Sequence, residues 1–267
     1  MKIGVFTDNH SSGLENEIVK GFAKENIDLI INLGDIIEPE RGEELVKITN
    51  TFLELKKPFI SIPGNYESIY EWDFLSKKLK DNTYFIDGEK NTVFNYGEIS
   101  FISIPGFRTP NLANLKEKTL KYANLNKSIV LSHEPPKQNS KQATDLAIQA
   151  ENILTGQVVF GRNTKSYIYS GNYKKKFEHR GNLLIRKFID DLNIHFIFSG
   201  HIHEGLNAYS KEGIEIKEDE YTSSLFFNPG PAKNGIYAII TLDENSMSLS
   251  YKRHLLFGIS GYEELKK

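Results

Sequence analysis

The sequence predicts an α/β fold in which two β-sheets pack into a sandwich, one half mostly parallel and the other more antiparallel. Strand-like and helix-like segments alternate through the first eighty residues, and the strands are apolar along their whole length. Both features are typical of a buried parallel sheet. After residue 205, short strand patterns follow one another without helical segments, which indicates antiparallel pairing.

The parallel half is expected to contain three strands and three helices in alternation. Each strand is a short apolar run, and the helices place apolar residues at helical spacing, as Leu14, Ile18 and Phe22 do. The expected strands are residues 2–8, 29–35 and 58–64, and the expected helices are residues 14–27, 42–56 and 72–80.

The second half mixes a hairpin, buried strands and two further helices. A Tyr-Gly turn within residues 92–106 predicts the hairpin. Residues 128–136 and 194–203 are expected to be buried strands that end in histidine-bearing loops. Helices are expected at residues 145–154 and 181–191. The expected antiparallel strands are residues 213–219, 223–231, 235–243 and 246–254.

The composition is that of an ordinary soluble globular protein. The chain has 267 residues, of which 39% are hydrophobic and 25% charged, and its net charge of −2 gives no global basic field for nucleic acid. The absence of cysteine excludes disulfides, thiolate metal sites and cysteine nucleophiles. No signal peptide or membrane-spanning run is visible, so we expect one cytoplasmic domain over residues 1–267, with no membrane partner.

Residues 137–180 interrupt the rhythm of the sequence and are expected to be a variable basic insert. Such a charge run is usually a solvated surface, but its position between two histidine loops also allows contact with a substrate. Its basic residues stand among several tyrosines and include Arg162, Lys165, Lys174, Lys175, Lys176, His179 and Arg180.

Polar residues stand at the ends of five expected strands, where open α/β sheets bind their ligands. Alternate residues of an extended chain project to one side, so Asp8 with His10, and His201 with His203, can each direct two groups at one point. Each pattern alone is weak, and it is the five together that indicate a site. The residues are Asp8, His10, Asp35, Asn65, His133, His201 and His203.

Four imidazoles, two carboxylates and one amide form a nitrogen and oxygen ligand set without sulfur. Such a set suits Mn²⁺, Fe or Zn²⁺. Seven ligands exceed what one transition ion normally takes and suit two ions that share a bridging carboxylate. We therefore expect a site for two divalent metal ions, most readily Mn²⁺, with Fe, Zn²⁺ and Ni²⁺ as alternatives.

The five motifs together resemble the signature of the calcineurin-like metallophosphoesterases. They are DNH (8–10), GD (34–35), GN (64–65), SHEP (132–135) and GHIH (200–203), and the resemblance covers about residues 2–240. It implies a four-layer αββα sandwich with two mixed β-sheets. It also implies that Asp8, His10 and His203 hold one metal, that Asn65, His133 and His201 hold the second, and that Asp35 bridges them.

A closer resemblance is to the Icc-related predicted phosphoesterases. It lies in HEPP (133–136), in the segment 181–191, in GHIHEG (200–205) and in FFNPGPAKNGIYAII (226–240). In such proteins the segment before residues 181–191 is variable. The turn that contains Asn228 is expected to support the histidine loop and not to supply a ligand.

One position departs from the family pattern. Many members carry His after the Gly-Asn pair, where it protonates or stabilises the leaving oxygen, and this sequence has Tyr66. A phenol with a pKa of about 10 is a poor acid near neutrality, although it can donate a hydrogen bond. Tyr66 and His179 are therefore weak candidates for a catalytic group, and Arg108 and Arg180 are weak candidates for binding the substrate phosphate.

The sequence thus favours a dinuclear metal-dependent phosphoesterase that hydrolyses a P–O bond with metal-bound hydroxide as the nucleophile. The absent His favours a phosphodiester or an activated phosphoester, either a small molecule or a nucleotide. Two alternatives stay open. One is a non-catalytic metal-binding scaffold on the same fold, and the other is a nuclease that uses Lys174–Lys176. A homo-oligomer is compatible with the sequence.

Overall fold

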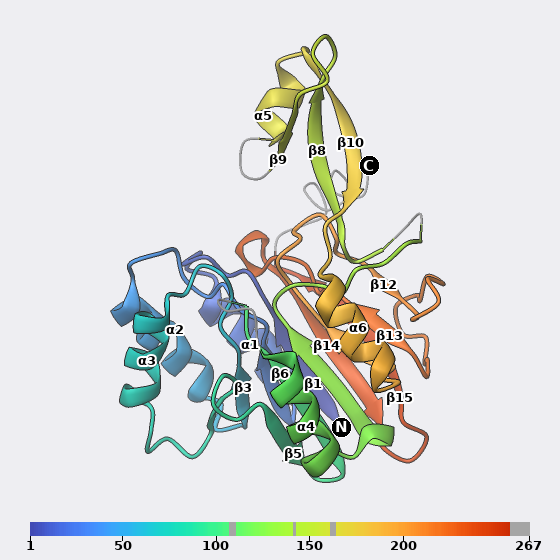
Figure 1. Cartoon of the computed structure of the whole chain (residues 1–267). Coiled ribbons are helices and arrows are strands. Elements are labelled where there is room, and N and C mark those ends of the chain that lie inside the picture. The colour runs from blue at the N-terminus through green and yellow to red at the C-terminus, as the bar shows by residue number, and fades with distance from the viewer. Residues whose placement is uncertain (107–110, 141–142, 161–163, 257–267) are drawn as a thin grey trace.

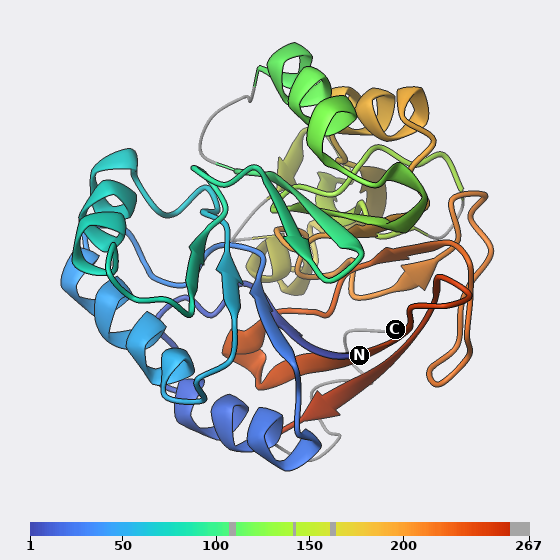
Figure 2. The same ribbon diagram turned by 90° about the horizontal axis from the view of Figure 1, so that it is seen from below.

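Two six-stranded sheets face each other at the centre of the protein, and helices cover the outer face of each sheet (Figures 1 and 2). The computed structural model describes residues 1–106, 111–140, 143–160 and 164–256. A third, three-stranded sheet stands apart from these layers.

The first sheet has the strand order β15-β14-β1-β2-β3-β4. Strands β1 to β4 are parallel, and β14 pairs antiparallel with both β1 and β15. The strands are β1 (Lys2–Phe6), β2 (Leu29–Asn32), β3 (Phe59–Ser61), β4 (Phe85–Asp87), β14 (Ile236–Asp243) and β15 (Ser248–Leu255).

The second sheet has the strand order β12-β13-β11-β7-β6-β5. Its four central strands are parallel, while β5 and β12 are antiparallel edges. The strands are β5 (Val93–Tyr96), β6 (Ile99–Ile104), β7 (Ser128–Ser132), β11 (Phe196–Phe198), β12 (Ala208–Tyr209) and β13 (Leu225–Phe227).

Each sheet has its own helical layer, as the view in Figure 2 shows. Helices α1 (Glu15–Glu25), α2 (Gly42–Leu53) and α3 (Ile69–Lys78) cover the first sheet, and α4 (Leu112–Tyr122) and α6 (Leu183–Asp191) cover the second. Side chains cap three of the helix starts, and at α4 the Asn111 side chain accepts the Asn114 N–H. Ser68 and Glu71 form a capping box at α3, and Asn182 accepts the Leu184 and Ile185 N–H groups at α6. Two 3₁₀ turns, Leu125–Lys127 and Ala232–Asn234, complete these layers.

Three apolar cores lie between these four layers, because successive residues of a strand face opposite sides of its sheet. In β1, Ile3 and Val5 join the core between the sheets, while Phe6 joins the core under α1, α2 and α3. In β7, Ile129 lies in the core between the sheets and Val130 in the core under α4 and α6. The fully apolar strands of the sequence are thus explained by burial on both faces.

The third sheet forms an arm that projects from the sandwich (Figure 1). We use the word arm for residues 146–179. They contain β8 (Leu146–Asn152), β9 (Val158–Phe160), α5 (Thr164–Tyr169) and β10 (Tyr173–His179). The strand order is β10-β8-β9, and both pairings are antiparallel.

Most sequence predictions for the sandwich are confirmed. The α/β fold with two mixed sheets between helical layers is present. Residues 92–106 contain the expected hairpin, in which β5 and β6 pair antiparallel around Gly97. The helix expected at residues 181–191 is α6. Helix α4 and strand β4 were not expected from the sequence.

Three predictions are wrong. Residues 145–154 form strand β8 and not a helix, because pairing with β9 and β10 outweighs the helix propensity of their Ala, Leu, Gln and Glu residues. The strand within residues 223–231, β13, pairs antiparallel with β12 as expected, but the prediction is wrong on its other side, where β13 is parallel to β11 because the long connection after β11 returns the chain before β13 begins. Residues 213–219 form no strand, and one bridge joins Glu215 to Tyr209.

Replacing Phe52 by alanine should destabilise the sandwich by about 3–5 kcal/mol. Phe52 is fully buried and stacks on Phe6 of β1, with ring centroids 4.2 Å apart and planes 12° apart. Equilibrium denaturation measures the effect. Tyr70→Ala in α3 is the control, since Tyr70 is 83% exposed and its loss should change stability by less than about 0.5 kcal/mol. Equal losses in both variants would contradict this core.

Candidate metal centre

The seven polar residues singled out in the sequence follow strands of both sheets. Asp8 and His10 follow β1, Asp35 follows β2 and Asn65 follows β3, whereas His133 follows β7 and His201 and His203 follow β11. The structure brings six of them into two groups, and within each group the potential ligand atoms lie within 4.8 Å of one another. The groups are Asp8, His10 and His203, and Asp35, His133 and His201.

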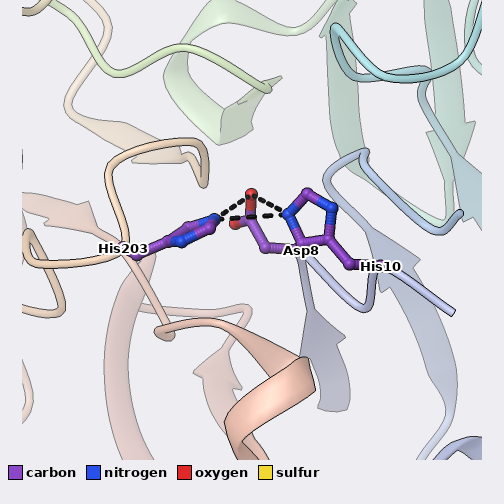
Figure 3. A group of neighbouring side chains, drawn as sticks. All are labelled: Asp8, His10 and His203. Carbon is purple, nitrogen blue, oxygen red and sulfur yellow. Dashed lines mark hydrogen bonds and ion pairs between the residues drawn. The ribbon is translucent and has the colours of Figure 1, made fainter. Parts of the chain in front are cut away.

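In the first group the three side chains converge on one point (Figure 3). The His203 Nε2 lies 3.2 Å from the Asp8 Oδ1 and 3.4 Å from the His10 Nε2. The His10 Nε2 is 3.9 Å from the same carboxylate oxygen. Two imidazole nitrogens and a carboxylate oxygen at such distances match the donor set that divalent transition ions prefer.

The second group gains the amide of Asn65. The His133 Nε2 lies 2.9 Å from the Asn65 Oδ1 and 3.3 Å from the Asp35 Oδ2. On the other side of its ring, the His133 Nδ1 lies 2.8 Å from the Leu33 carbonyl oxygen, which can only accept. That bond places a proton on Nδ1 and directs Nε2 at the group, as in many metal-binding histidines. The His201 ring lies 5.0 Å from the His133 ring, between centroids.

Asp35 lies between the two groups. Its Oδ2 is 3.3 Å from the His133 Nε2 and 3.9 Å from the His10 Nε2, so one carboxylate reaches both. Its Oδ1 accepts the backbone N–H of Tyr66 at 2.9 Å. This bond fixes the carboxylate in the orientation that serves both groups.

Four of the polar residues have left-handed backbone conformations. The φ angles are 53° at Asp8, 47° at His10, 56° at Asp35 and 64° at His201. Non-glycine residues rarely adopt positive φ, and such strain persists where the surrounding structure enforces it, commonly at functional sites. The backbone here is held in unfavourable conformations that direct these side chains toward one region.

Two glycines allow the loops to approach one another. A Cβ on Gly64 would collide with the Asp35 carboxylate, and a Cβ on Gly200 would collide with Thr7 and come within 2.8 Å of the Asp8 Oδ2. Side chains at these positions would displace the two carboxylates. The close packing fits a compact centre for small cations.

Glu67 is the residue that sequence reasoning missed. Its side chain is buried, and its two oxygens accept four backbone N–H groups. The donors lie 2.6–3.2 Å away and belong to Asp35, Ile36, Ile37 and Gly64. Glu67 thereby joins the loop after β2 to the loop after β3. Its place directly after Asn65-Tyr66 was the only signal available, since the sequence does not reveal burial.

Burial and mutual charge govern the protonation of the donors. Burial lowers the pKa of His10 to about 4, so this imidazole is neutral near pH 7. Burial would raise the pKa of Asp8, but the hydrogen bond and charge of His203 outweigh it and hold the pKa below its usual value. Burial opposes the charge on His133, yet the Asp35 carboxylate raises its pKa to about 10. A cation in this group would compete with that proton.

The same factors act on Glu67. Burial and the nearby charge of Asp35 raise its pKa to about 7, while the N–H groups of Gly64 and Ile37 oppose the rise. Positive charge between the two groups would favour the ionised form. The acceptor network of Glu67 and any bound cation would therefore stabilise each other.

The weaker sequence candidates have other surroundings. The Tyr66 and His10 rings pack in a T-shaped arrangement, with centroids 4.6 Å apart and planes at 81°. His179 pairs with the buried Asp145, its Nδ1 lying 2.8 Å from the Oδ1. Arg180 pairs with Glu178 at 2.7 Å. Arg108 lies outside the described residues.

The turn after β13 supports the histidine loop, as expected. The Asn228 amide donates to the carbonyls of Gly200 and Ile202, and its oxygen accepts the Gly230 N–H. The same turn brings in Lys233, whose N–H donates to the Asp8 carbonyl. Burial is the main cause of the low pKa of His10, and the positive charge of Lys233 adds to it.

Comparisons with known proteins agree on the fold. The family described as calcineurin-like phosphoesterase matches residues 1–205. A Thermus thermophilus protein, TT1561, shares 12% identity over 94% of this chain and 97% of its own, with a TM-score of 0.60. A dimetal phosphatase from Danio rerio shares 9% identity over 96% and 93%, with a TM-score of 0.50. At such identities the two structures support the fold alone. No curated protein sequence matches this one significantly.

Replacing Glu67 by glutamine should weaken metal binding by roughly 10- to 100-fold, the range typical of residues that position ligands. The amide would present a donor to N–H groups that need an acceptor, and the loops that carry Asp35 and Asn65 would separate. Calorimetric titration with Mn²⁺ measures the affinity. Glu71→Gln is the matched control, because Glu71 caps α3 and accepts N–H groups of Arg41 and Ser68. Equal affinities in the Glu67 variant and the unaltered protein would contradict this role.

Proposed function

Because this chain belongs to the calcineurin-like phosphoesterase family, we propose that it is a dinuclear metal-dependent phosphoesterase. It would hydrolyse a P–O bond of a phosphodiester or of an activated phosphoester. The observation that carries the proposal is the position of Asp35 between two groups of metal-binding side chains. Two adjacent divalent ions that share a carboxylate are a recurring arrangement for phosphoryl chemistry.

The side chains divide naturally between two ions. Asp8, His10 and His203 would hold the first ion, Asn65, His133 and His201 would hold the second, and Asp35 would contact both. When bound, such ions supply an activated water for attack and neutralise the charge that develops on the phosphoryl oxygens. Mn²⁺ is the ion we favour, since the donors are nitrogen and oxygen atoms only.

The chain itself orients these donors. The Leu33 carbonyl fixes the tautomer of His133, and the Tyr66 N–H fixes the Asp35 carboxylate. The positive charge of Lys233, whose backbone N–H donates to the Asp8 carbonyl, would favour an anionic phosphoryl group on this side of the centre. Such preorganisation costs no rearrangement when the substrate reacts.

The leaving group is where this protein should differ from many of its relatives. Tyr66 stands beside His10 at the position where they carry His. A phenol can donate a hydrogen bond to the leaving oxygen but is a poor proton donor near neutral pH. We therefore favour substrates whose leaving groups depart without protonation, which includes activated esters and many diesters.

The two alternative functions receive less support. A non-catalytic scaffold would not need the seven donor residues, all of which are present and directed at one region. A nuclease that used Lys174–Lys176 would gain less from this cluster, because Glu151 offsets part of its positive charge. Lys174 and Lys176 both pair with Glu151, at 3.1 and 3.2 Å.

Asp35→Ala should lose both metal ions, because the carboxylate is shared. The metal content of the purified protein after loading with Mn²⁺ should fall from two ions per chain to none, and turnover of nitrophenyl mono- and diesters should vanish, as it should after chelation of the unaltered protein. Asp73→Ala, at an exposed position of α3, is the matched control and should keep both. Full metal content in the Asp35 variant would contradict the bridging role.

Tyr66→His should restore proton donation to the leaving oxygen. We expect hydrolysis of phenyl phosphate to rise roughly 10- to 100-fold relative to nitrophenyl phosphate. This gain is at or below the smallest rate gains that general acid catalysis typically provides. Tyr66→Phe separates this effect from loss of the hydroxyl. The same rate change for good and poor leaving groups would show that position 66 does not serve the leaving oxygen.

A further inference from the structure

The arm has very little core of its own. Among the described residues between 146 and 179, only Gln149, Ala150 and Thr164 are buried. Ordering each residue of a chain costs about 1–2 kcal/mol of backbone entropy, which burial of apolar surface normally offsets. A small sheet with so few buried side chains is expected to gain stability by packing against another surface.

Large apolar side chains of the arm are instead exposed to solvent. Their combined exposed surface is on the order of 800 Å², about one partner's share of a standard protein interface. Monomeric proteins rarely expose so much apolar surface in one small region. The residues and their exposed fractions are Ile153 60%, Leu154 92%, Val158 38%, Phe160 63%, Tyr167 38%, Tyr169 84% and Phe177 53%.

These side chains lie on both faces of the arm. In the strand register, Phe160 pairs with Gln149, and Phe177 pairs with the adjacent Ile148. Neighbouring residues of a strand face opposite sides, so Phe160 and Phe177 project from opposite faces of the sheet. A surface that covers both must enclose the arm.

The arm and the rest of the chain carry opposite charge. The arm, residues 146–179, contains five Lys and Arg against two Asp and Glu, a net charge of +3, so the remaining residues carry −5. Residues 38–44, which lead from the loop after β2 into the first turn of α2, hold four glutamates and one arginine and follow Asp35. Of these, Glu40 and Glu43 are exposed. The rest of the same chain therefore carries the negative charge that would attract the positively charged arm.

We propose that the arm is a dimerisation element, and that in solution each arm packs against the acidic body of a second copy of this chain. The exposed apolar residues supply the buried area, and the lysines of β10 face the acidic surface of the partner. A reciprocal pair of such contacts forms a closed two-fold dimer. This inference concerns assembly and does not depend on the proposed reaction.

The base of the arm is held rigidly, as a specific dimer requires. The buried Asp145 accepts the N–H groups of Gln138 and Gly181 and pairs with His179. Its own carbonyl accepts the Arg180 N–H. These bonds join the two strands of the base and set the direction of the arm before a partner binds, which lowers the entropy lost on association.

A membrane or a nucleic acid fits the arm less well. A bilayer would contact the tip around Leu154 and leave Phe160 and Phe177 in water. A nucleic acid backbone would contact the lysines of β10 but would leave the apolar side chains Leu154, Phe160 and Phe177 in water. A second copy satisfies both the apolar surface and the charge.

Sedimentation velocity over a range of concentrations tests the proposal. The unaltered protein should sediment at twice the chain mass of 30.5 kDa, and the triple variant Leu154→Ser, Phe160→Ser, Phe177→Ser at the mass of one chain. The control replaces Tyr70, Leu120 and Tyr122, exposed apolar residues of the helices, with serine and should stay dimeric. Circular dichroism and Mn²⁺ content should match in all three proteins, which excludes misfolding.

A charge reversal tests where the arm binds. Lys174→Glu, Lys175→Glu, Lys176→Glu should raise the dissociation constant of the dimer at least tenfold, and combining it with Glu40→Lys, Glu43→Lys should recover most of that loss. A monomeric unaltered protein at every concentration would overturn the proposal, as would a dimer that survives the serine variant or a charge reversal without effect. So would monomers that bind anionic vesicles or oligonucleotides through the arm.

Discussion

The acceptance of four backbone N–H groups by the buried carboxylate of Glu67 is the interaction on which the candidate metal centre depends. The loop after β2 and the loop after β3 both turn away from the sheet with N–H groups that have no strand partner, and Glu67 accepts four of them. Hydrogen bonds to an ionised acceptor contribute about 1.5–3 kcal/mol each. They offset the strain of Asp35, whose φ of 56° no strand would impose. Without this acceptor, the Asp35 carboxylate and the Asn65 amide would not meet at one position.

The sandwich supplies the second condition, which is rigidity on both sides of the centre. The donors come from two sheets, and the apolar core between those sheets fixes the distance from Asp8 to His203. The polar groups of the site have no hydrogen-bond partner in a neighbouring strand, and they lie where the strands end. The function therefore lies at the edge of the sheets, while their faces are devoted to packing.

Much of this could be predicted because burial and chemistry leave separate marks in the sequence. Apolar strands followed at once by Asp, Asn or His gave both the sheets and the donor residues. Glu67 could not be recognised in this way, because its role depends on N–H groups of a loop about thirty residues earlier in the chain. Strand β8 was mistaken for a helix because its residues favour helices locally, and only pairing with β9 and β10 makes it a strand. The direction of β13 depends likewise on where a long connection returns.

The place of Tyr66 follows from the same distinction between backbone and side chain. The centre uses the N–H of residue 66, which fixes the Asp35 carboxylate, and any residue except proline supplies that group. The two groups of donors can therefore be complete while the side chain at this position differs from the histidine of many relatives. In the function we propose, metal binding and leaving-group chemistry would depend on separate parts of one short loop. A protein can keep the first and change the second, and the change then selects among substrates without disturbing the centre that binds the ions.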